Sequence, residues 1–370
     1  MQLQLIEPVQ LVGPSLLRRS SPARVTKYRK VRDLRVTRTL YAMNEAEQAI
    51  LVADIGGTNA RFSVWFVGQS RRAFTWSCET SQYTSFDSCL EQLMAEMPVN
   101  TFAAACFAVA GVVHNNKCSL TNLGWIVDAE AIQSRFDIRK VRVINDFEAV
   151  GFGVFELDRS DILTLHAGEQ ELSGTIAVLG PGTGLGEAIL TWDRMSGRYS
   201  VHPTEGSHAD FAARGSLQHE LCTWVEEQLS ECEVEHVCSG PGLVRIYDFL
   251  CERNNHVLPH LTPAEISSKA CSGTCKVCSQ AVDMFLEILG AEAANLSLKC
   301  LATGGVYIAG GIPAKIKDIL TNGRLGNAFL RPGSKMHALR NSFPLYVVLN
   351  PEVGVLGSKS VALKILHEPT

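Results

Sequence analysis

Residues 51–61 combine one carboxylate with a glycine-rich turn. They read Leu-Val-Ala-Asp-Ile-Gly-Gly-Thr-Asn-Ala-Arg, and a second apolar run follows at 62–67. This pattern predicts a β-hairpin with Asp54 close to its tip. Adjacent glycines permit positive φ and lack Cβ atoms, so backbone N–H groups there can approach an anion such as phosphate. The turn residues that offer donors are Gly56, Gly57, Thr58 and Asn59.

The position of Asp54 beside this turn suggests what the anion is. A carboxylate would repel a bare phosphate unless a divalent cation lay between them. The pairing therefore favours a magnesium nucleotide, with Asp54 as a metal ligand. An ordinary hairpin turn with a chance acid remains the alternative.

A second glycine-rich stretch reads Gly-Pro-Gly-Thr-Gly-Leu-Gly at 180–186 and follows a predicted strand at 175–179. Lys and Ser/Thr do not follow its last glycine, so it is not a P-loop, and Leu185 breaks the G-x-G-x-x-G spacing. We expect a phosphate-binding hairpin, with a purely structural turn as the alternative. Its central residues are Gly182, Thr183 and Gly184. Gly310 and Gly311 end another predicted strand, where an adenine or ribose could lie against bare backbone.

Asn145 and Asp146 follow a predicted strand at 140–144. In α/β enzymes, ligands bind beyond the carboxyl ends of strands. A carboxylate at this place can accept the proton of an attacking hydroxyl group, and the neighbouring amide can bind a second hydroxyl. The alternative is that Asp146 caps a helix beginning at Phe147. The residues alone leave both interpretations open.

Four more polar residues fit a polyol ligand, because they offer acceptors and donors for several hydroxyl groups. They are Asn122, Glu205, His208 and Glu235. Each of these residue types, taken singly, is usually an ordinary surface residue.

The elements that must position these residues alternate in type. The apolar patterns predict strands at 51–55, 61–67, 73–79, 103–110, 140–144, 175–179, 187–192, 198–202, 306–309 and 343–349. Helices are expected at 84–96, 147–155, 216–229, 241–252, 262–270, 277–301 and 353–366, and no internal repeat is visible. A mixed sheet with helices outside it is the α/β class. Gly354 and Gly357 leave one side of the last helix open to close approach by another helix.

The chain has 370 residues, and 46% of them are hydrophobic. A chain of this length and composition has more hydrophobic residues than one compact core normally holds. We therefore expect two lobes with a ligand cleft between them. The predicted small α/β domain comprises residues 49–156 and 350–370, and the large one residues 157–349.

Composition excludes several function classes. The net charge of -4 and the pI near 6.2 give no electrostatic footprint for nucleic acid. No apolar run approaches the roughly 20 residues of a membrane helix. The 12 cysteines are scattered, which favours reduced thiols in a reducing compartment. Cys271, Cys275 and Cys278 could offer thiolates to zinc, but no fourth ligand has metal-site spacing, so structural thiols are favoured.

Residues 1–48 differ from the rest of the chain because they are basic and rich in Ser and Thr. Their Arg and Lys residues are Arg18, Arg19, Arg24, Lys27, Arg29, Lys30, Arg32, Arg35 and Arg38. Only Glu7 and Asp33 oppose them before Met43. This composition predicts either an organellar transit peptide, with a plastid stroma or another organelle as the destination, or a disordered tail on a cytoplasmic protein.

Six motifs, in order along residues 49–366, resemble those of the bacterial-type glucokinases, which are ATP-dependent hexose kinases of the actin-like ATPase superfamily. They are Asp54-Ile-Gly-Gly-Thr-Asn-Ala-Arg61, Ile144-Asn-Asp-Phe147, Gly180-Pro-Gly-Thr-Gly-Leu-Gly186, Glu205-Gly-Ser-His-Ala-Asp-Phe211, Ser239-Gly-Pro-Gly-Leu243 and Ile308-Ala-Gly-Gly-Ile312. The resemblance implies a two-lobed, ribonuclease H-like fold with a central cleft, ATP and Mg²⁺ as cofactors, glucose as substrate and a homodimer.

The resemblance also implies a role for each matching residue. Asp146 matches the general base, which takes the proton of the glucose 6-hydroxyl. The sugar-binding positions are matched by Asn122, Asn145, Asp146, Glu205, His208 and Glu235. The phosphate, magnesium and nucleotide positions are matched by Asp54, Gly56, Gly57, Thr58, Asn59, Gly182, Thr183, Gly184, Gly310 and Gly311.

Two alternatives need to be separated from this interpretation. A sugar-binding regulator, or a kinase for another hexose, could use the same scaffold. The related open-reading-frame kinases and repressors share Asp-x-Gly-Gly-Thr, but they typically carry a Cys/His zinc motif after the sugar-site histidine, and residues 209–221 hold no cysteine. A leader of about 48 residues is also too short for a repressor's DNA-binding domain.

Overall fold

The computed structural model describes residues 48–99, 101–120, 122–255 and 259–368. Glu45–Thr370 form one compact unit. The basic leader therefore lies outside the described residues, and the transit-peptide interpretation stays a prediction. Within the described ranges, no helix is long and apolar enough to cross a membrane.

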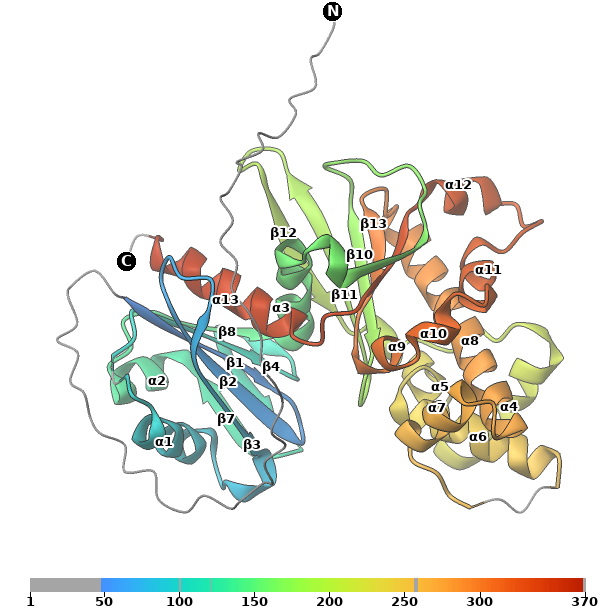
Figure 1. The fold of residues 1–370 in the computed structure, drawn as a ribbon, viewed down its shortest axis with the longest axis horizontal. Helices are drawn as coiled ribbons and strands as arrows, with labels where there is room; N and C mark the ends of the chain where they lie inside the picture. Colours follow the sequence, from blue (N-terminus) through green and yellow to red (C-terminus); the bar gives the residue numbers. More distant parts are fainter. Residues whose placement is uncertain (1–47, 100, 121, 256–258, 369–370) are drawn as a thin grey trace, which may run out of the picture. The chain divides into compact units, whose positions relative to one another are not determined.

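The first sheet has five strands in the order β3-β2-β1-β4-β8, of which β1, β4 and β8 are parallel (Figure 1). Its strands are β1 (Ala49–Ile55), β2 (Asn59–Phe66), β3 (Arg72–Glu79), β4 (Ala104–Val109) and β8 (Val141–Asn145). All five agree with the predicted strands to within a few residues. β1, β4 and most of β8 are buried apolar runs, whereas β3 alternates between half-buried and exposed residues.

Alternate residues of β1 pack against different helices, since successive side chains of a strand point to opposite faces. Leu51 and Ala53 belong to the apolar cluster with α1 (Phe86–Glu96) and α2 (Ala129–Phe136). Ile50 and Val52 pack with α13 (Val353–Leu366) instead. The first sheet is therefore covered by helices on both faces.

Three short strands that the sequence did not predict form a small separate sheet, β5-β6-β7. They are β5 (Val113–His114), β6 (Lys117–Leu120) and β7 (Trp125–Asp128). Trp125 is buried, and its indole N–H donates to the carbonyl of Tyr83 at 3.2 Å. This sheet carries the loop that contains Asn122.

The second large sheet has six strands in the order β12-β11-β10-β13-β14-β9. They are β9 (Ile162–His166), β10 (Ile176–Pro181), β11 (Leu185–Asp193), β12 (Arg198–Thr204), β13 (Gly305–Ile308) and β14 (Leu345–Val348). Its first five strands repeat the order of the first sheet, with a parallel trio flanked by an antiparallel hairpin. The chain thus holds a repeat of topology that no repeat of sequence reveals.

The remaining helices follow or separate these strands. They are α3 (Asp146–Gly153), α4 (Gly215–Leu229), α5 (Val234–Val237), α6 (Gly240–Arg253), α7 (Pro263–Cys271), α8 (Lys276–Cys300), α9 (Gly311–Lys315), α10 (Lys317–Leu320), α11 (Arg324–Leu330) and α12 (His337–Ser342). The sequence did not predict the helices α2, α5 and α9 to α12, or the strand β9. The α7 start agrees with its sequence signal: Thr262 and Glu265 form a capping box, with Pro263 in the first turn.

Helices α3 and α13 pack closely against each other. A Cβ atom at Gly357 would overlap the carbonyl of Ala149, and one at Gly153 would overlap the backbone of Val353. The predicted close approach at Gly357 is therefore confirmed. Residues of α3 and α13 also join the apolar clusters of both large sheets, so this helix pair contacts both of them.

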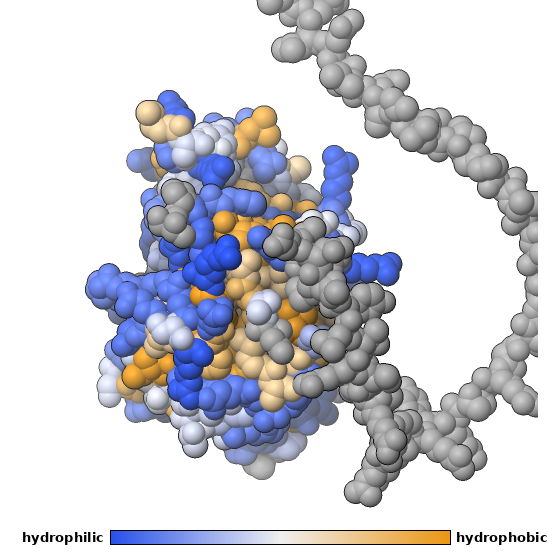
Figure 2. Space-filling model, turned by 90° about the vertical axis from the view of Figure 1, so that its left-hand side faces the viewer, coloured by the Kyte–Doolittle hydropathy of each residue, from blue (hydrophilic) through white to orange (hydrophobic). Residues whose placement is uncertain are grey.

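Figure 2 shows one side of the molecule, coloured by hydropathy. Apolar residues gather near the centre of the described surface on this side, and hydrophilic residues surround them.

Candidate functional site

Asp54 and Asp146 lie at the same edge of the first sheet. Asp54 pairs across β1 and β4 with Ala108, and Ala108 pairs across β4 and β8 with Ile144. Parallel strands end at a common edge. The two carboxylates that sequence reasoning assigned to metal and to base are therefore brought together from positions 92 residues apart, by β4 lying between their strands.

The turn after Asp54 is held by one backbone hydrogen bond and by one from a side chain. The Gly56 N–H donates to the carbonyl of Asn59 at 2.9 Å, and the Thr80 hydroxyl donates to the carbonyl of Gly57 at 2.9 Å. Neither Gly56 nor Gly57 uses the positive φ that glycine permits. What distinguishes Gly57 is open space: a Cβ there would meet no atom within 4 Å. With Thr58 also exposed, the turn presents bare backbone to a ligand.

Asn145, and not Asp146, caps α3. Its side-chain oxygen accepts from the N–H groups of Phe147 at 2.8 Å and Glu148 at 3.3 Å, and its side-chain nitrogen donates to the carbonyl of Gly111 at 3.1 Å. The alternative that Asp146 caps a helix beginning at Phe147 is therefore wrong, because the helix already begins at Asp146. Asn145 keeps one N–H hydrogen for a ligand.

The carboxyl group of Asp146 is perturbed strongly. Burial, followed by the charge of Asp54 and, more weakly, that of Glu205, raises the pKa of Asp146 to about 7. The N–H of Phe147, which donates to it at 3.0 Å, acts in the opposite direction. A carboxylate with a pKa near neutrality is a stronger base than an exposed one, as general-base catalysis requires.

Phe147 joins this edge to the second glycine stretch. A Cβ at Gly186 would overlap the Phe147 ring, and one at Gly180 would lie 2.8 Å from it. The glycines therefore leave the space that the ring fills. Because Phe147 directly follows Asp146, this packing brings Asp146 close to the hairpin of β10 and β11.

The second glycine stretch forms a tight hairpin turn between β10 and β11. The Gly182 N–H donates to the carbonyl of Gly184 at 2.7 Å, and Thr183 at the tip is exposed. A Cβ at Gly182 would meet nothing within 4 Å. Gly310 adopts φ 93°, a conformation that favours glycine, and a Cβ there would overlap the carbonyl of Pro181. The turn and the Gly310-Gly311 step are thus neighbours.

Glu235 hydrogen-bonds the end of this turn through its side chain. Its Oε2 accepts from the Leu185 N–H at 2.8 Å, and the carbonyl of Gly182 accepts from the Gly240 N–H at 2.8 Å. The sequence assigned Glu235 to the sugar alone. The structure gives it a second task, since one carboxylate oxygen is already engaged with the glycine turn and the other remains for a ligand.

Glu205 and His208 lie together on the loop after β12, and a residue that the sequence analysis missed joins them. His208 Nδ1 lies 2.7 Å from Glu233 Oε2, and His208 Nε2 lies 3.8 Å from Glu205 Oε2. The hydrogen bond with Glu233 raises the pKa of His208, against the effect of burial. Glu233 also begins α5, where His236 completes a capping box with it. The spacing Glu-x-x-His before a short helix was the available signal.

A second missed residue is Glu187, the residue after Gly186. Its side chain is buried, and Oε1 has no hydrogen-bond partner among the described residues. A Cβ at Gly206 would overlap its Oε2, so Glu187 lies beneath the loop that carries Glu205. Burial and then the charge of Glu292 raise the pKa of Glu187 to about 7. An acid inside the apolar pattern of β11 was the signal.

Asn122 is exposed on the loop between β6 and β7. Among the described residues, no hydrogen bond or ion pair joins it to the other proposed sugar ligands. Its assignment therefore depends on the resemblance alone.

The carboxylate of Asp54 is a suitable ligand for a magnesium ion. Mg²⁺ is usually held by one or two carboxylates, while water and substrate phosphates supply its other ligands. Burial raises the pKa of Asp54, and Arg61 opposes the shift, so a cation beside the carboxylate would relieve its desolvation. Within the described ranges, no three His, Cys, Asp or Glu side chains are grouped closely enough to hold a metal ion. Cys271, Cys275 and Cys278 therefore do not form such a group either.

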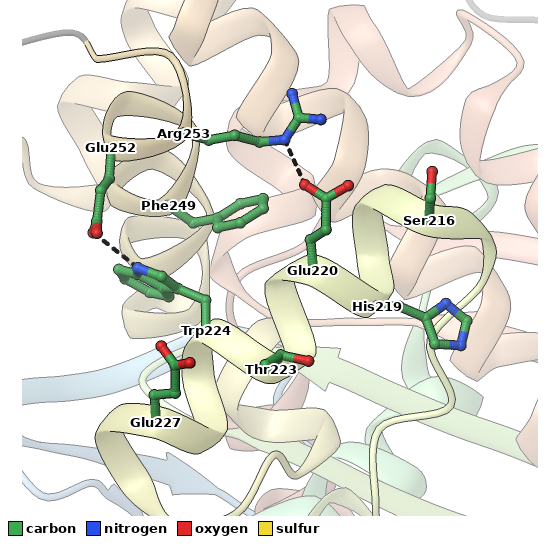
Figure 3. Close-up of a pocket in the computed structure, with 9 residues that line it drawn as sticks. All are labelled: Ser216, His219, Glu220, Thr223, Trp224, Glu227, Phe249, Glu252 and Arg253. Atoms are coloured by element: carbon green, nitrogen blue, oxygen red, sulfur yellow. Dashed lines mark hydrogen bonds and ion pairs between the residues drawn. The ribbon is translucent and has the colours of Figure 1, made fainter.

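A separate surface pocket of about 650 Å³ is lined by residues of α4 and α6 (Figure 3). Two contacts cross it: the Trp224 indole donates to Glu252 at 2.8 Å, and Arg253 pairs with Glu220 at 2.7 Å. None of its lining residues belongs to the candidate site.

Comparisons with known proteins find similar sequences and similar structures. The glucokinase of the cyanobacterium Trichormus variabilis is 33% identical over 342 residues, covering 85% of this chain and 99% of the relative. The crystal structure of a glucokinase from an Antarctic psychrotroph has a TM-score of 0.74 and 30% identity, covering 86% of this chain and 99% of the other. A ROK family glucokinase from Streptomyces griseus, solved in complex with glucose and AMPPNP, has a TM-score of 0.60 and 18% identity, covering 85% of this chain and 99% of the other.

The last of these likenesses concerns the fold alone, a mixed α/β fold shared with sugar kinases. The family model described as glucokinase matches residues 51–365, which include every proposed site residue. The chain therefore belongs to the glucokinase family.

Proposed function

We propose that this protein is an ATP-dependent glucokinase, which transfers the γ-phosphoryl group of ATP to the 6-hydroxyl of glucose, the first step of glycolysis. The observation that carries the proposal is the position of Asp146. Asp146 does not cap α3, and its pKa lies near neutrality. The packing of Phe147 brings it close to the second glycine turn.

The nucleotide half of the site would be built mainly from backbone. The N–H groups of Gly57 and Thr183 can donate to phosphate oxygens, and Thr58 and Thr183 add hydroxyl donors. Gly182 leaves the approach to its turn open. Gly56, Asn59, Gly184, Gly310 and Gly311 complete the proposed nucleotide-binding set. Mg²⁺, held by Asp54, would neutralise the negative charge of the phosphate oxygens during phosphoryl transfer.

The sugar half would use side chains. Glu205, His208 and the free oxygen of Glu235 can each bond a hydroxyl group. Asn145 can donate its remaining N–H, and Asn122 is proposed to close the set from the loop of the small sheet. Asp146 itself would bind the reacting 6-hydroxyl.

The chemical role of Asp146 is to accept a proton. Its carboxylate hydrogen-bonds the 6-hydroxyl, orients the oxygen towards the γ-phosphorus, and takes the hydroxyl proton as the new oxygen–phosphorus bond forms. General-base assistance of this kind supplies about 10²–10⁴ in rate, and positioning supplies most of the remainder.

We also propose that residues 49–156 with 350–370, and residues 157–349, are two lobes that close on the substrates and exclude water. The packed pair α3 and α13 would be the axis of this motion, because it belongs to the apolar clusters of both sheets. A homodimer is proposed from the family resemblance, and light scattering of the purified protein tests it.

The direct test of the function is a coupled assay for sugar phosphate, with glucose, mannose, fructose and N-acetylglucosamine as substrates. ATP-dependent product with glucose, at the highest kcat/KM of the four, supports the proposal. A higher kcat/KM for another sugar would identify a different hexose kinase. Binding of glucose without turnover would identify a sugar-binding regulator.

The leader has a separate test. If residues 1–48 are a transit peptide, a reporter fused to them enters an organelle. A diffuse cytosolic reporter would favour the alternative of a basic tail.

A further inference from the structure

The helix α8 begins with two cysteines in the spacing Cys275-Lys-Val-Cys278. The family's proposed chemistry uses neither of them, and no candidate site residue lies between 271 and 278. A C-x-x-C pair at the start of a helix is the arrangement that thiol–disulfide exchange uses in proteins, provided that the first thiol is reactive and the second is within reach.

The geometry at the start of α8 meets both conditions. Cys275 is the N-cap residue, and its sulfur accepts the N–H of Cys278 at 3.5 Å. Cys275 is partly exposed, whereas Cys278 is fully buried one turn further on. An outside molecule can thus reach the first sulfur. This sulfur already contacts the backbone N–H of Cys278, so the second cysteine lies one helical turn away, within reach of the first.

The acidity of the two thiols differs in the sense that exchange requires. Burial raises the pKa of Cys275, but hydrogen bonds from the Cys278 N–H, the Cys278 thiol and the Val277 N–H, together with the charge of Lys269, outweigh it, so the pKa lies below its ordinary value. All 12 cysteines of the chain are described, and the pKa of each of the others is raised. Cys275 is therefore the thiol that most readily forms the nucleophilic thiolate.

We propose that Cys275 and Cys278 are a redox-active dithiol that exchanges with small disulfides such as oxidised glutathione. The Cys275 thiolate attacks one sulfur of glutathione disulfide, forms a mixed disulfide and releases one glutathione thiolate. Cys278 then loses its proton to solvent, attacks the Cys275 sulfur, and releases the second glutathione. Two electrons pass from the protein thiols to glutathione disulfide, which ends as two glutathione thiols.

The second step becomes easier once the first has occurred. Burial, followed by the hydrogen bond and charge of Cys275, raises the pKa of Cys278 to about 12. A mixed disulfide at Cys275 removes that negative charge, so Cys278 ionises more readily at the moment when its thiolate is needed.

Another cysteine pair serves as an internal comparison. The sulfurs of Cys78 and Cys89 lie 3.5 Å apart, close enough to approach each other for a bond. Burial raises the pKa of both thiols. Proximity without a thiolate predicts slow exchange, so this pair should stay reduced while Cys275 and Cys278 react.

The test uses the reduced full-length protein, incubated with glutathione disulfide at pH 7 and quenched with acid and a thiol-blocking reagent. Trypsin cleaves after Lys276, so a Cys275–Cys278 disulfide links peptide Ala270–Lys276 to peptide Val277–Lys299, and mass spectrometry detects the linked pair. Cys271→Ser removes the other cysteine of the first peptide and should leave the linkage unchanged. Iodoacetamide should alkylate Cys275 at least about tenfold faster than Cys271 at pH 7.

Two variants separate the steps. Cys278→Ser, or Cys278→Ala if the serine variant folds poorly, should trap glutathione on Cys275. Cys275→Ser keeps a good N-cap residue, so α8 should remain folded while both the linkage and the adduct disappear. The proposal is overturned if Cys275 is alkylated no faster than Cys271, if the wild-type protein retains an unresolved glutathione adduct, or if Cys78–Cys89 forms first.

Discussion

Asp54 lies near the end of β1 and Asp146 directly follows β8, with β4 between the two strands, and the charge of Asp54 helps to raise the pKa of Asp146 to about 7. Two acids held at one edge cannot both ionise freely. A bound cation can stabilise the negative charge of one carboxylate, and a bound proton can neutralise the other. This division matches the proposed assignment of Asp54 to the metal and of Asp146 to the substrate proton.

The raised pKa of Asp146 predicts a pH dependence. A general base acts only when deprotonated, so kcat/KM for glucose should fall about tenfold per pH unit below the inflection and level off above it. The inflection is expected at or somewhat below about 7, since a cation beside Asp54 removes part of the raising charge. Initial rates between pH 5 and 8.5 measure it, and a flat profile across this range would contradict the assignment.

Replacing Glu205 should affect the sugar and spare the nucleotide. Glu205→Gln should raise KM for glucose roughly 10- to 100-fold, because a hydrogen bond to a charged group is worth about 1.5–3 kcal/mol. KM for ATP should change less than about twofold. Glu220→Gln is the matched control, since Glu220 pairs with Arg253 in the separate pocket of Figure 3. The reverse ranking of the two KM effects would mean that the sites are exchanged.

Two glycines of one turn should respond differently to alanine. Gly186→Ala places a Cβ in the Phe147 ring, and overpacking of this kind costs about 1–3 kcal/mol of unfolding free energy. Gly182→Ala meets open space, so stability should hold while KM for ATP rises. Denaturant unfolding and ATP kinetics of both variants measure the difference. Equal loss of stability in the two would show that Phe147 does not fit the turn as described.

Glu187 should make stability depend on pH. Its pKa is raised from 4.5 to about 7, so the folded state binds the proton more tightly than the unfolded chain does. The resulting stabilisation is fully present below about pH 4.5 and is lost as pH rises through about 7. The loss amounts to about 3 kcal/mol.

Glu187→Gln keeps the shape of the protonated side chain and removes the titration. The difference in unfolding free energy between wild type and variant should therefore change across this pH range. A constant difference from pH 5 to 8 would show that Glu187 is not held protonated. Glu292 and Lys299, which face Glu187, stay unchanged in both proteins.

Most of the longer elements, including several that carry the site, could be predicted from sequence. β1, β10 and α8 are long apolar patterns, and Thr262 with Glu265 marks the start of α7 by local hydrogen bonding alone. β5 and β7 were missed because they are short and lack an alternating pattern of useful length. The helices α9 to α12 are likewise only four to seven residues long.

The parts of the site that could not be predicted depend on contacts between distant residues. Glu233 gains its role because folding brings it to His208, and Glu235 gains a second one because β11 begins beside it. The choice between Asn145 and Asp146 as the cap depends on a carbonyl of Gly111, which receives the Asn145 side chain. No local pattern contains these relationships.

The central claim is that Asp146 takes the proton in a glucokinase reaction, and the most direct measurement compares single-turnover formation of glucose 6-phosphate by wild type and by Asp146→Asn. Glucose and ATP binding are measured on both proteins by calorimetry. Wild type should form the product, and Asp146→Asn should bind both ligands but react about 10²–10⁴ times more slowly. Turnover by Asp146→Asn at the wild-type rate would contradict the account.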